Sequence, residues 1–248
     1  MKVVVIGGTG LIGSKVVAKL NAHGHEAVPA APQTGVNTLT NEGLDEALAG
    51  ADVVVDVSNS PSFEDDAVMS FFVTSTTNLI EAEKKGGVKH HVALSVVGTG
   101  TLPDSGYLRA KAAQEKLIED SGIPYSIVHA TQFFEFTRAI ADSSTIDGKL
   151  HLAPVHYQPM ASDDVATAVG RVAVGTPLNG TKEIGGPEKL RMDQFIPAVL
   201  ERAGDRREVV VDQHAKYFGT ELADGSLVPG PGAELGSTTY EQWAGQPA

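Results

Sequence analysis

The chain has 248 residues, among them 27 glycines, 13 prolines and no cysteine, and its formal net charge is −12. The lack of cysteine excludes disulfides, thiolate metal sites and a cysteine nucleophile, and we expect no metal site of another kind. The acidic balance argues against nucleic acid as a partner, because phosphate binding needs a basic surface. No run approaches the roughly 18 apolar residues of a membrane span, so we expect a cytoplasmic protein with no membrane partner.

The first half of the chain alternates short runs of β-branched residues with segments of helical periodicity. Continuous apolar runs are typical of strands that are buried on both faces. Helices between such strands indicate right-handed βαβ units, and therefore a doubly wound parallel α/β sheet. We expect strands at residues 3–6, 26–30, 51–57, 88–97 and 125–130, and helices at residues 11–22, 41–49, 65–85 and 106–120.

The second half is less regular. Gly, Pro and Ser become frequent from Gly219 onward, which predicts a loosely packed tail with one short helix at residues 240–243. We expect a single domain over residues 1–248, in which residues from about 150 add a small C-terminal substrate lobe and the tail; a homo-oligomer is left open. The expected elements are helices at 133–141, 162–174 and 192–203, and strands at 149–152, 158–160, 181–184 and 208–211.

A glycine-rich segment follows the first expected strand. Gly8, Gly10 and Gly13 form G-x-G-x-x-G, while Gly7 adds a second, overlapping spacing. Glycine permits a sharp turn, a close approach of the backbone to a pyrophosphate and tight packing of helix on strand. Because the motif joins a buried strand to an amphipathic helix, whose free N–H groups attract anions, it predicts dinucleotide binding. The expected contacts of this loop are Gly7, Thr9, Gly10, Leu11, Ile12 and Gly13.

The end of the second expected strand bears on the choice of cofactor. An NAD site normally has Asp or Glu there to bind the ribose 2′-hydroxyl, about 20 residues after the glycines. Here the strand ends without a carboxylate and without an arginine, in a segment that contains Gln33 and Thr34. Both side chains can donate hydrogen bonds to a 2′-phosphate. We therefore expect NADP in preference to NAD, with Gln33 and Thr34 among its contacts.

A possible catalytic set consists of Ser95, Tyr107 and Lys111. Tyr107 and Lys111 have the spacing Y-x-x-x-K at the start of an expected helix, which places them on one helix face. Ser95 lies near the carboxyl end of the fourth expected strand, the edge at which parallel sheets bind ligands. Tyr107 would protonate a developing alkoxide, Lys111 would lower the tyrosine pKa and hold the nicotinamide ribose, and Ser95 would orient the substrate oxygen. Taken alone, a Tyr–Lys pair on a helix is more often a surface feature.

Together the glycine loop, Ser95 and the Tyr107/Lys111 pair resemble the short-chain dehydrogenase/reductase superfamily, and in particular its atypical branch of NmrA-like and NAD(P)H-binding proteins. The resemblance implies a Rossmann core with NADP or NAD and a small C-terminal lobe. Gln132 falls in the stretch that follows the fifth strand in this family. The further cofactor contacts that the resemblance implies are Val57, Ser58 and Asn59 after the third strand, Val96 after the fourth, Lys111, and Ala130, Thr131 and Phe133 after the fifth.

The sequence departs from the family at His129, where many atypical members carry an arginine. If that arginine contacts the cofactor in relatives, His129 is not expected to replace it. The favoured function is an NAD(P)H-dependent oxidoreductase that reduces a small carbonyl or quinone-like substrate. One alternative is an NmrA-like regulator that senses NADP without turnover; retention of Tyr107 and Lys111 favours the enzyme. Another is a sugar-nucleotide epimerase or dehydratase. His90 and His91 are interpreted as a solvated strand start.

Overall fold

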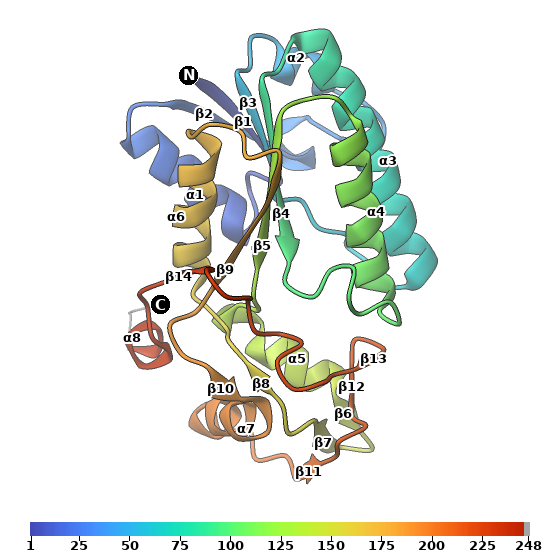
Figure 1. The fold of residues 1–248 in the computed structure, drawn as a ribbon, viewed down its shortest axis with the longest axis vertical. Helices are drawn as coiled ribbons and strands as arrows, with labels where there is room; N and C mark the ends of the chain where they lie inside the picture. The colour runs from blue at the N-terminus through green and yellow to red at the C-terminus, as the bar shows by residue number, and fades with distance from the viewer. Residues whose placement is uncertain (246–248) are drawn as a thin grey trace.

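The computed structural model describes residues 1–245, in which one seven-stranded sheet forms the centre of the molecule (Figure 1). Its spatial order is β14-β9-β5-β4-β3-β1-β2, and every neighbouring pair is parallel. This arrangement confirms the doubly wound parallel α/β fold. The strands are β1 Lys2–Ile6, β2 Glu26–Ala30, β3 Val53–Asp56, β4 His90–Val96, β5 Tyr125–Ala130, β9 Gly180–Gly185 and β14 Glu234–Leu235.

Two pairs of helices cover the two faces of this sheet (Figure 1). Helices α1 (Leu11–Ala22) and α6 (Ser162–Ala173) pack side by side on one face, and α3 (Asp65–Gly86) and α4 (Gly106–Asp120) on the other. The short helix α2 (Leu44–Leu48) lies beside α3. Since both faces are covered, the central strands can be apolar along their whole length, which explains their continuous valine runs.

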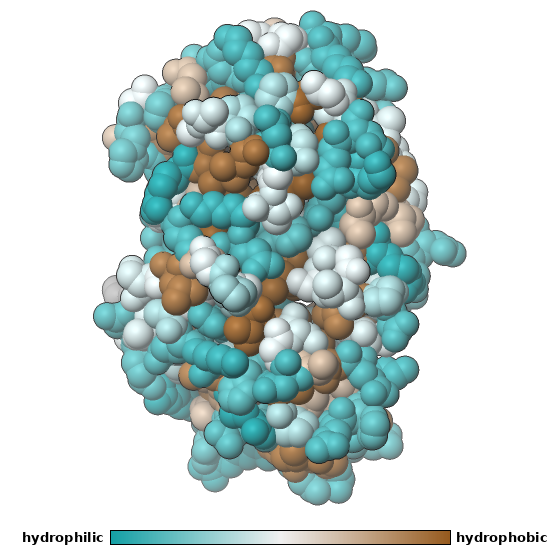
Figure 2. Space-filling view, viewed as in Figure 1, coloured by the Kyte–Doolittle hydropathy of each residue, from teal (hydrophilic) through white to brown (hydrophobic). Residues whose placement is uncertain are grey.

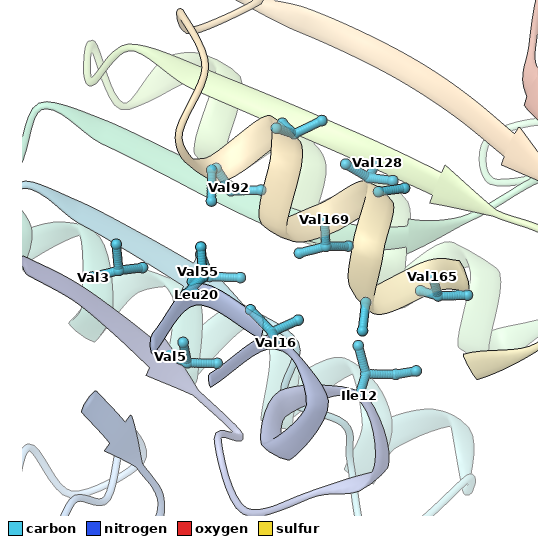
Figure 3. Close-up of a cluster of buried hydrophobic side chains, with 14 of the residues drawn as sticks. Val3, Val5, Ile12, Val16, Leu20, Val55, Val92, Val128, Val165 and Val169 are labelled. Carbon is cyan, nitrogen blue, oxygen red and sulfur yellow. The ribbon is translucent and has the colours of Figure 1, made fainter. Parts of the chain in front are cut away.

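The apolar core lies between the sheet and the helices α1 and α6 (Figure 3). Val3 and Val5 point from β1 toward this layer, where Val16 of α1 and Val169 of α6 meet them. All four side chains are fully buried. Burial of a valine of this kind stabilises the fold by roughly 1.5–3 kcal/mol.

The carboxyl ends of the strands face a smaller lobe, which has its own apolar cluster (Figure 1). Tyr157, Leu150 and Ile196 are buried at its centre. The elements of this lobe are α5 Thr137–Ser143, β6 Thr145–Ile146, β7 Lys149–Leu152, β8 His156–Tyr157, β10 Leu190–Arg191, α7 Met192–Arg202, β11 Val209–Val211, β12 Lys216–Tyr217 and β13 Thr220–Glu221.

Three expected elements differ from those observed. The helix expected at 41–49 starts only at Leu44, because Asn41 and Gly43 have positive φ angles of 64° and 66°, which a right-handed helix cannot contain. The helix expected at 133–141 is a 3-10 turn at Phe134–Phe136 followed by α5. The strand expected at 158–160 lies instead at 156–157. Pro159 has no N–H for a continued ladder, and the Met160 N–H donates to Gln132 O at 2.8 Å.

The C-terminal segment is packed against the body, contrary to the expectation of a loose tail. β14 joins the edge of the central sheet, and helix α8 (Tyr240–Ala244) begins at a capping box on Thr239. The Trp243 Nε1–H donates to Glu135 at 3.1 Å, and the Tyr240 ring meets Phe195 edge-on at 4.7 Å. Composition alone is a poor guide here, because these aromatic contacts come from distant parts of the chain.

His90 and His91 are buried, so their interpretation as a solvated strand start was wrong. They begin β4, which is a central strand with neighbours on both sides. The His91 Nδ1 lies 2.7 Å from a carboxylate oxygen of Glu83 in α3, and the His90 Nε2 lies 2.9 Å from the Ser126 hydroxyl. A strand start is solvated only where neighbouring elements leave it uncovered.

The side of the molecule shown in Figure 2 is mostly hydrophilic, with small hydrophobic patches. Within residues 1–245, no helix combines the length and the apolar character that a membrane crossing needs.

Candidate cofactor-binding and catalytic site

The glycine loop between β1 and α1 forms a tight cradle. Gly7 has a φ angle of 75°, and its N–H donates to Ala30 O at 2.9 Å. A Cβ on Gly8 would lie 2.6 Å from the backbone of Pro29, and one on Gly13 only 2.2 Å from Gly7 O. Side chains at these positions would therefore push strand, turn and helix apart. The glycines are required by the turn itself as well as by any ligand.

The start of α1 has unsatisfied capacity for an anion. Gly10 is its N-cap, no side chain caps the helix, and its first turn has no acidic residue. Among residues 1–245, no side chain caps the free N–H groups at this end of the helix, and no acidic residue of its first turn meets the positive end of the helix dipole. Thr9, Gly10 and Leu11 are exposed at this turn, whereas Ile12 is buried and anchors the helix. These features fit a bound pyrophosphate.

Other predicted cofactor residues lie next to this cradle. Val57 N–H donates to Ile6 O at 3.0 Å, and a Cβ on Gly7 would lie 3.0 Å from the Ser58 backbone. β1 and β3 are the strands at which the sheet order reverses, and this switch point is where doubly wound sheets bind ligands. The structure thus brings the first and third strand ends together. Asn59 follows them and is exposed.

Gln33 and Thr34, which were predicted to favour NADP over NAD, differ in whether their side chains are free to contact a ligand. Thr9 donates its hydroxyl to Gln33 Oε1 at 3.2 Å, which ties Gln33 to the glycine loop. The Thr34 hydroxyl accepts from the Ala31 N–H at 2.9 Å and so closes the local turn. Gln33 therefore keeps a free amide NH₂ beside the cradle, while Thr34 mainly serves the turn.

Lys111 is buried in α4 and belongs to a polar network. Its ammonium donates to Leu94 O at 2.9 Å and to Gln114, and it lies 4.5 Å from the centre of the Phe72 ring. Gln114 in turn donates to Asp56 Oδ2 at 2.9 Å. Burial lowers the pKa of Lys111 to about 8, and the charges of Asp56 and Glu115 oppose this fall. The lysine is therefore tied to the backbone directly before Ser95.

Ser95 takes part in a second polar group on the same side of the sheet. Its hydroxyl donates to Glu115 in α4 and lies 3.4 Å from the Thr99 hydroxyl. The same Glu115 oxygen lies 2.9 Å from His129 Nε2. His129, at the position where relatives were expected to have arginine, thus pairs with a carboxylate. Ser95 itself is almost fully buried.

Tyr107 opens α4 in an aromatic environment. Ser105 caps the helix, since its side chain accepts from the Leu108 N–H. The Tyr107 ring lies 6.0 Å from Phe72 and 5.6 Å from Phe63, measured between ring centres. Burial raises the pKa of the Tyr107 phenol. The phenol and the Lys111 ammonium thus share contacts with Phe72, while the ammonium donates to partners other than the phenol.

The remaining predicted residues line the ends of β4 and β5. Ala130 is buried at the end of β5, and its carbonyl accepts from Val97 N–H at 2.9 Å, next to the half-buried Val96. The Thr131 hydroxyl donates to Gln158 O at 2.6 Å, so it fixes the loop. The Phe133 ring stacks on Phe136 at 5.4 Å.

Sequence reasoning missed four residues of this polar layer, namely Asp56, Gln114, Glu115 and the partnered His129. A signal existed for two of them, since Gln114 and Glu115 follow Lys111 by three and four residues and therefore share its helix face. Asp56 ends an otherwise apolar strand, which is also unusual. Their pairing was invisible because it joins β3, β5 and α4.

The switch-point cradle on a doubly wound sheet defines a dinucleotide-binding Rossmann protein. Residues 7–174 match the model of the NAD(P)H-binding family, and the chain belongs to that family. The match confirms the expected NAD(P)H-binding family.

Two relatives illustrate the range of functions in sequences similar to this one. The photosystem II assembly factor Ycf39 of Synechocystis sp. is 25% identical over 229 residues, which are 84% of this chain and 70% of that protein. A (4-alkanoyl-5-oxo-2,5-dihydrofuran-3-yl)methyl phosphate reductase of Streptomyces griseus is 27% identical over 206 residues, or 76% of this chain and 69% of that protein.

Solved structures share the fold at lower identity. UDP-glucose 4-epimerase of Thermus thermophilus, in complex with NAD, superposes with a TM-score of 0.69 and 20% identity, covering 92% of each chain. A dTDP-glucose 4,6-dehydratase double mutant of Streptomyces venezuelae, with NAD bound, gives 0.73 and 17%, covering 98% of this chain and 95% of that one.

Proposed function

We propose that the chain is an NAD(P)H-dependent oxidoreductase that reduces a small carbonyl or quinone-like substrate. The observation that carries this proposal is the uncapped glycine cradle at the switch point, with Lys111 and Tyr107 on the neighbouring strand–helix unit of the same sheet. We assign the substrate side to the lobe formed by residues from about 150. The glycine-loop residues, Ser58 and Gln33 would hold the nucleotide.

When bound, the nicotinamide supplies the hydride that reduces the carbonyl carbon. Tyr107 would donate its phenolic proton to the carbonyl oxygen to give an alcohol, and the resulting tyrosinate would regain a proton from solvent. Burial raises the Tyr107 pKa, so the phenol holds its proton at neutral pH but is a weaker acid than an ordinary tyrosine, and the expectation that Lys111 lowers this pKa was wrong. An ammonium has three N–H donors. Leu94 O and Gln114 accept two of those of Lys111, and we assign the third to the nicotinamide ribose.

A catalytic role of Ser95 in this scheme requires a change in the hydrogen bond of its hydroxyl. Its hydroxyl donates to Glu115 in this structure, so contact with the substrate oxygen requires it to turn away from that carboxylate. Ser95→Ala tests the assignment, because loss of an orienting hydroxyl lowers kcat/KM while the affinity for NADPH stays unchanged. Unchanged kcat/KM would remove Ser95 from the catalytic set.

Tyr107→Phe tests the reaction itself. We expect NADPH oxidation to fall by about 10²- to 10⁴-fold, the usual contribution of a positioned proton donor. NADPH affinity, measured by the fluorescence of the bound cofactor, should be nearly intact. Tyr125→Phe is a matched control, because Tyr125 opens β5 at the opposite end of the sheet. Equal turnover in Tyr107→Phe and wild type would reject this role.

We propose NADP as the preferred cofactor. The support is the lack of any carboxylate at residues 29–36 and the free amide of Gln33 next to the cradle. Thermal shift with NADP and NAD in parallel tests this, since a ligand stabilises the fold according to its own affinity. A larger shift with NAD would overturn the preference.

A binding protein without turnover is the second candidate. It is favoured by the similarity to Ycf39 assembly factors, and by the engagement of both Ser95 and Lys111 with partners inside the chain. It predicts NADPH binding with no oxidation across a panel of ketones, aldehydes and quinones. Steady oxidation with any of them would exclude it. A sugar-nucleotide epimerase would instead retain cofactor through purification.

A further inference from the structure

Gln132 is a buried amide without a partner. It follows β5 and is 7% exposed, yet neither its Nε2 nor its Oε1 meets a partner among residues 1–245. Its backbone is held firmly, because Gln132 O accepts from Met160 N–H at 2.8 Å. Leaving a buried amide unpaired destabilises a fold, so such groups are rare outside functional sites.

The hydroxyl of Tyr217 lies beside this amide. Burial raises the pKa of the Tyr217 phenol, the adjacent Gln132 amide opposes the rise, and Tyr107 adds to it. Ring contacts run from Tyr107 through Phe63 and Phe218 to Tyr217, and the Gln132 amide lies beside the Tyr217 phenol. Gln132 therefore lies on the side of the molecule that holds Tyr107, the proposed proton donor.

Aromatic rings surround this point. The Phe63 ring lies 5.6 Å from Tyr107 and 6.0 Å from Phe218, with interplanar angles of 42° and 30°. Phe218 also packs edge-on against Tyr217 at 4.8 Å. Phe63 is 54% exposed despite these neighbours, so an apolar surface remains open beside Tyr107.

Phe218 is held in an unfavourable backbone conformation. It and Gly219 form the two-residue turn between β12 and β13, which Figure 1 shows below the start of α4, and their φ angles are 43° and 88°. A turn of this kind strongly prefers Asn or Gly at its first position, because a bulky residue with positive φ is strained. Strain of this type is concentrated at ligand clamps. The strained turn lowers the stability of the fold, and it places the aromatic ring of Phe218 next to that of Phe63.

We propose that Gln132, Phe63 and Phe218 form the substrate site beside Tyr107, and that this site takes a flat, uncharged aromatic carbonyl compound. The aromatic ring lies against Phe63 and Phe218, and a carbonyl oxygen accepts a hydrogen bond from the Gln132 amide. The assignment rests on the proposed reductase function, whose substrate class it names.

The charges around the site disfavour a phosphorylated substrate. Asp65 lies against Gly106, immediately before Tyr107, and it pairs with Arg109, so that cation is already neutralised. Glu64 and Asp104 are further exposed acids next to this opening, in the loops that carry Phe63 and Tyr107. A sugar nucleotide would bring a diphosphate to this acidic surface, whereas an uncharged ring would meet no repulsion.

Calorimetric titration of the full chain, saturated with NADP⁺, tests the site without turnover, because NADP⁺ has no hydride to give. The probe is 2-methyl-1,4-naphthoquinone, with cyclohexanone and UDP-glucose as comparisons. We expect the naphthoquinone to bind most tightly. Gln132→Leu should weaken it about fivefold, the value of one neutral hydrogen bond, and Phe218→Asn about tenfold. Gln194→Leu, on the exposed side of α7, should leave its affinity unchanged.

The Tm of the variants distinguishes a ligand-binding role of Gln132 and Phe218 from a purely structural role. Gln132→Leu removes a buried unpaired amide, and Phe218→Asn relieves the turn, so both should raise Tm while they weaken binding. A fall in Tm with Gln132→Leu, equal naphthoquinone affinity in all variants, or tighter binding of UDP-glucose would each overturn the proposal. Because the readout is binding, failure of the reductase function leaves a separate signature, namely tight naphthoquinone binding without NADPH oxidation.

Discussion

The two faces of the central sheet differ in chemistry although they alternate along the same strands. On β3, Val53 and Val55 face α1 and α6, while Val54 and Asp56 face α3 and α4. On β4 and β5, Val92 and Val128 join the first layer, whereas His91, Ser95 and His129 bond to residues of α3 or α4.

The α1/α6 face is built for stability and the α3/α4 face carries the polar groups that chemistry needs. At the amino end of the sheet the first face holds a buried polar pair, His90 with Ser126. Burial of charged groups costs free energy, so each requires a partner on the opposing helix. Alternate residues of one strand can thus pack against α1 and α6 on one face of the sheet and supply polar groups to α3 and α4 on the other.

The largest effect on stability is expected for Asp56→Asn. Asp56 supplies a negative charge to the buried network of Lys111 and Gln114, and removal of one member of a buried charge pair costs roughly 3–5 kcal/mol. Urea unfolding would measure it. Asp52→Asn, at the exposed Lys89 pair, should cost much less, because solvent screens an exposed ion pair. Equal costs for the two variants would contradict the proposed importance of the buried network.

Lys111→Met should remove a pH dependence of stability. The folded-state pKa of Lys111 is about 8, below its ordinary value of 10.5, so the unfolded chain binds more protons between these values. The free energy of unfolding therefore rises from pH 8 toward pH 10 by an amount on the order of 2–3 kcal/mol in wild type relative to the variant. Denaturant unfolding of both proteins across this range measures the difference; parallel curves would contradict it.

On the apolar face, Val16→Ala should cost about 2 kcal/mol through lost burial and a small cavity. This variant sharpens the comparison because Val16 belongs to the buried apolar cluster of this face. Its loss of stability, measured by urea unfolding, should be the same at pH 6 and pH 9. A loss of stability that changes with pH would contradict this difference between the two faces of the sheet.

The smallest effect concerns His91 and Glu83. Burial alone would lower the pKa of His91, but the attraction and hydrogen bond of Glu83 outweigh it, and the net pKa is raised. The stabilisation is therefore full below pH 6.5 and is lost as pH rises through the folded-state pKa. Glu83→Gln should therefore flatten the stability profile above pH 6.5. An unchanged slope in thermal unfolding curves would contradict this.

Much of the Rossmann half was predictable because its signals are local. The runs of valine, the glycines at 7, 8, 10 and 13 and the helix over 106–120 each act within a few residues, and all were observed at or near the expected positions. The errors have two causes. The effects of Asn41 and Pro159 are local and were overlooked, whereas the packing of the C-terminal segment depends on partners such as Phe195 and Glu135, far away in the chain.

The sequence by itself determined the class of fold and the position of the glycine loop, because turn geometry and apolar periodicity are properties of short segments. Only the tertiary structure decided what surrounds the proposed catalytic residues. Ser95 donates to Glu115 and Lys111 donates to Leu94 O, and both contacts join separate elements. The lack of cysteine excluded one kind of chemistry, whereas the partners of each buried polar group depend on which helix covers which face of the sheet.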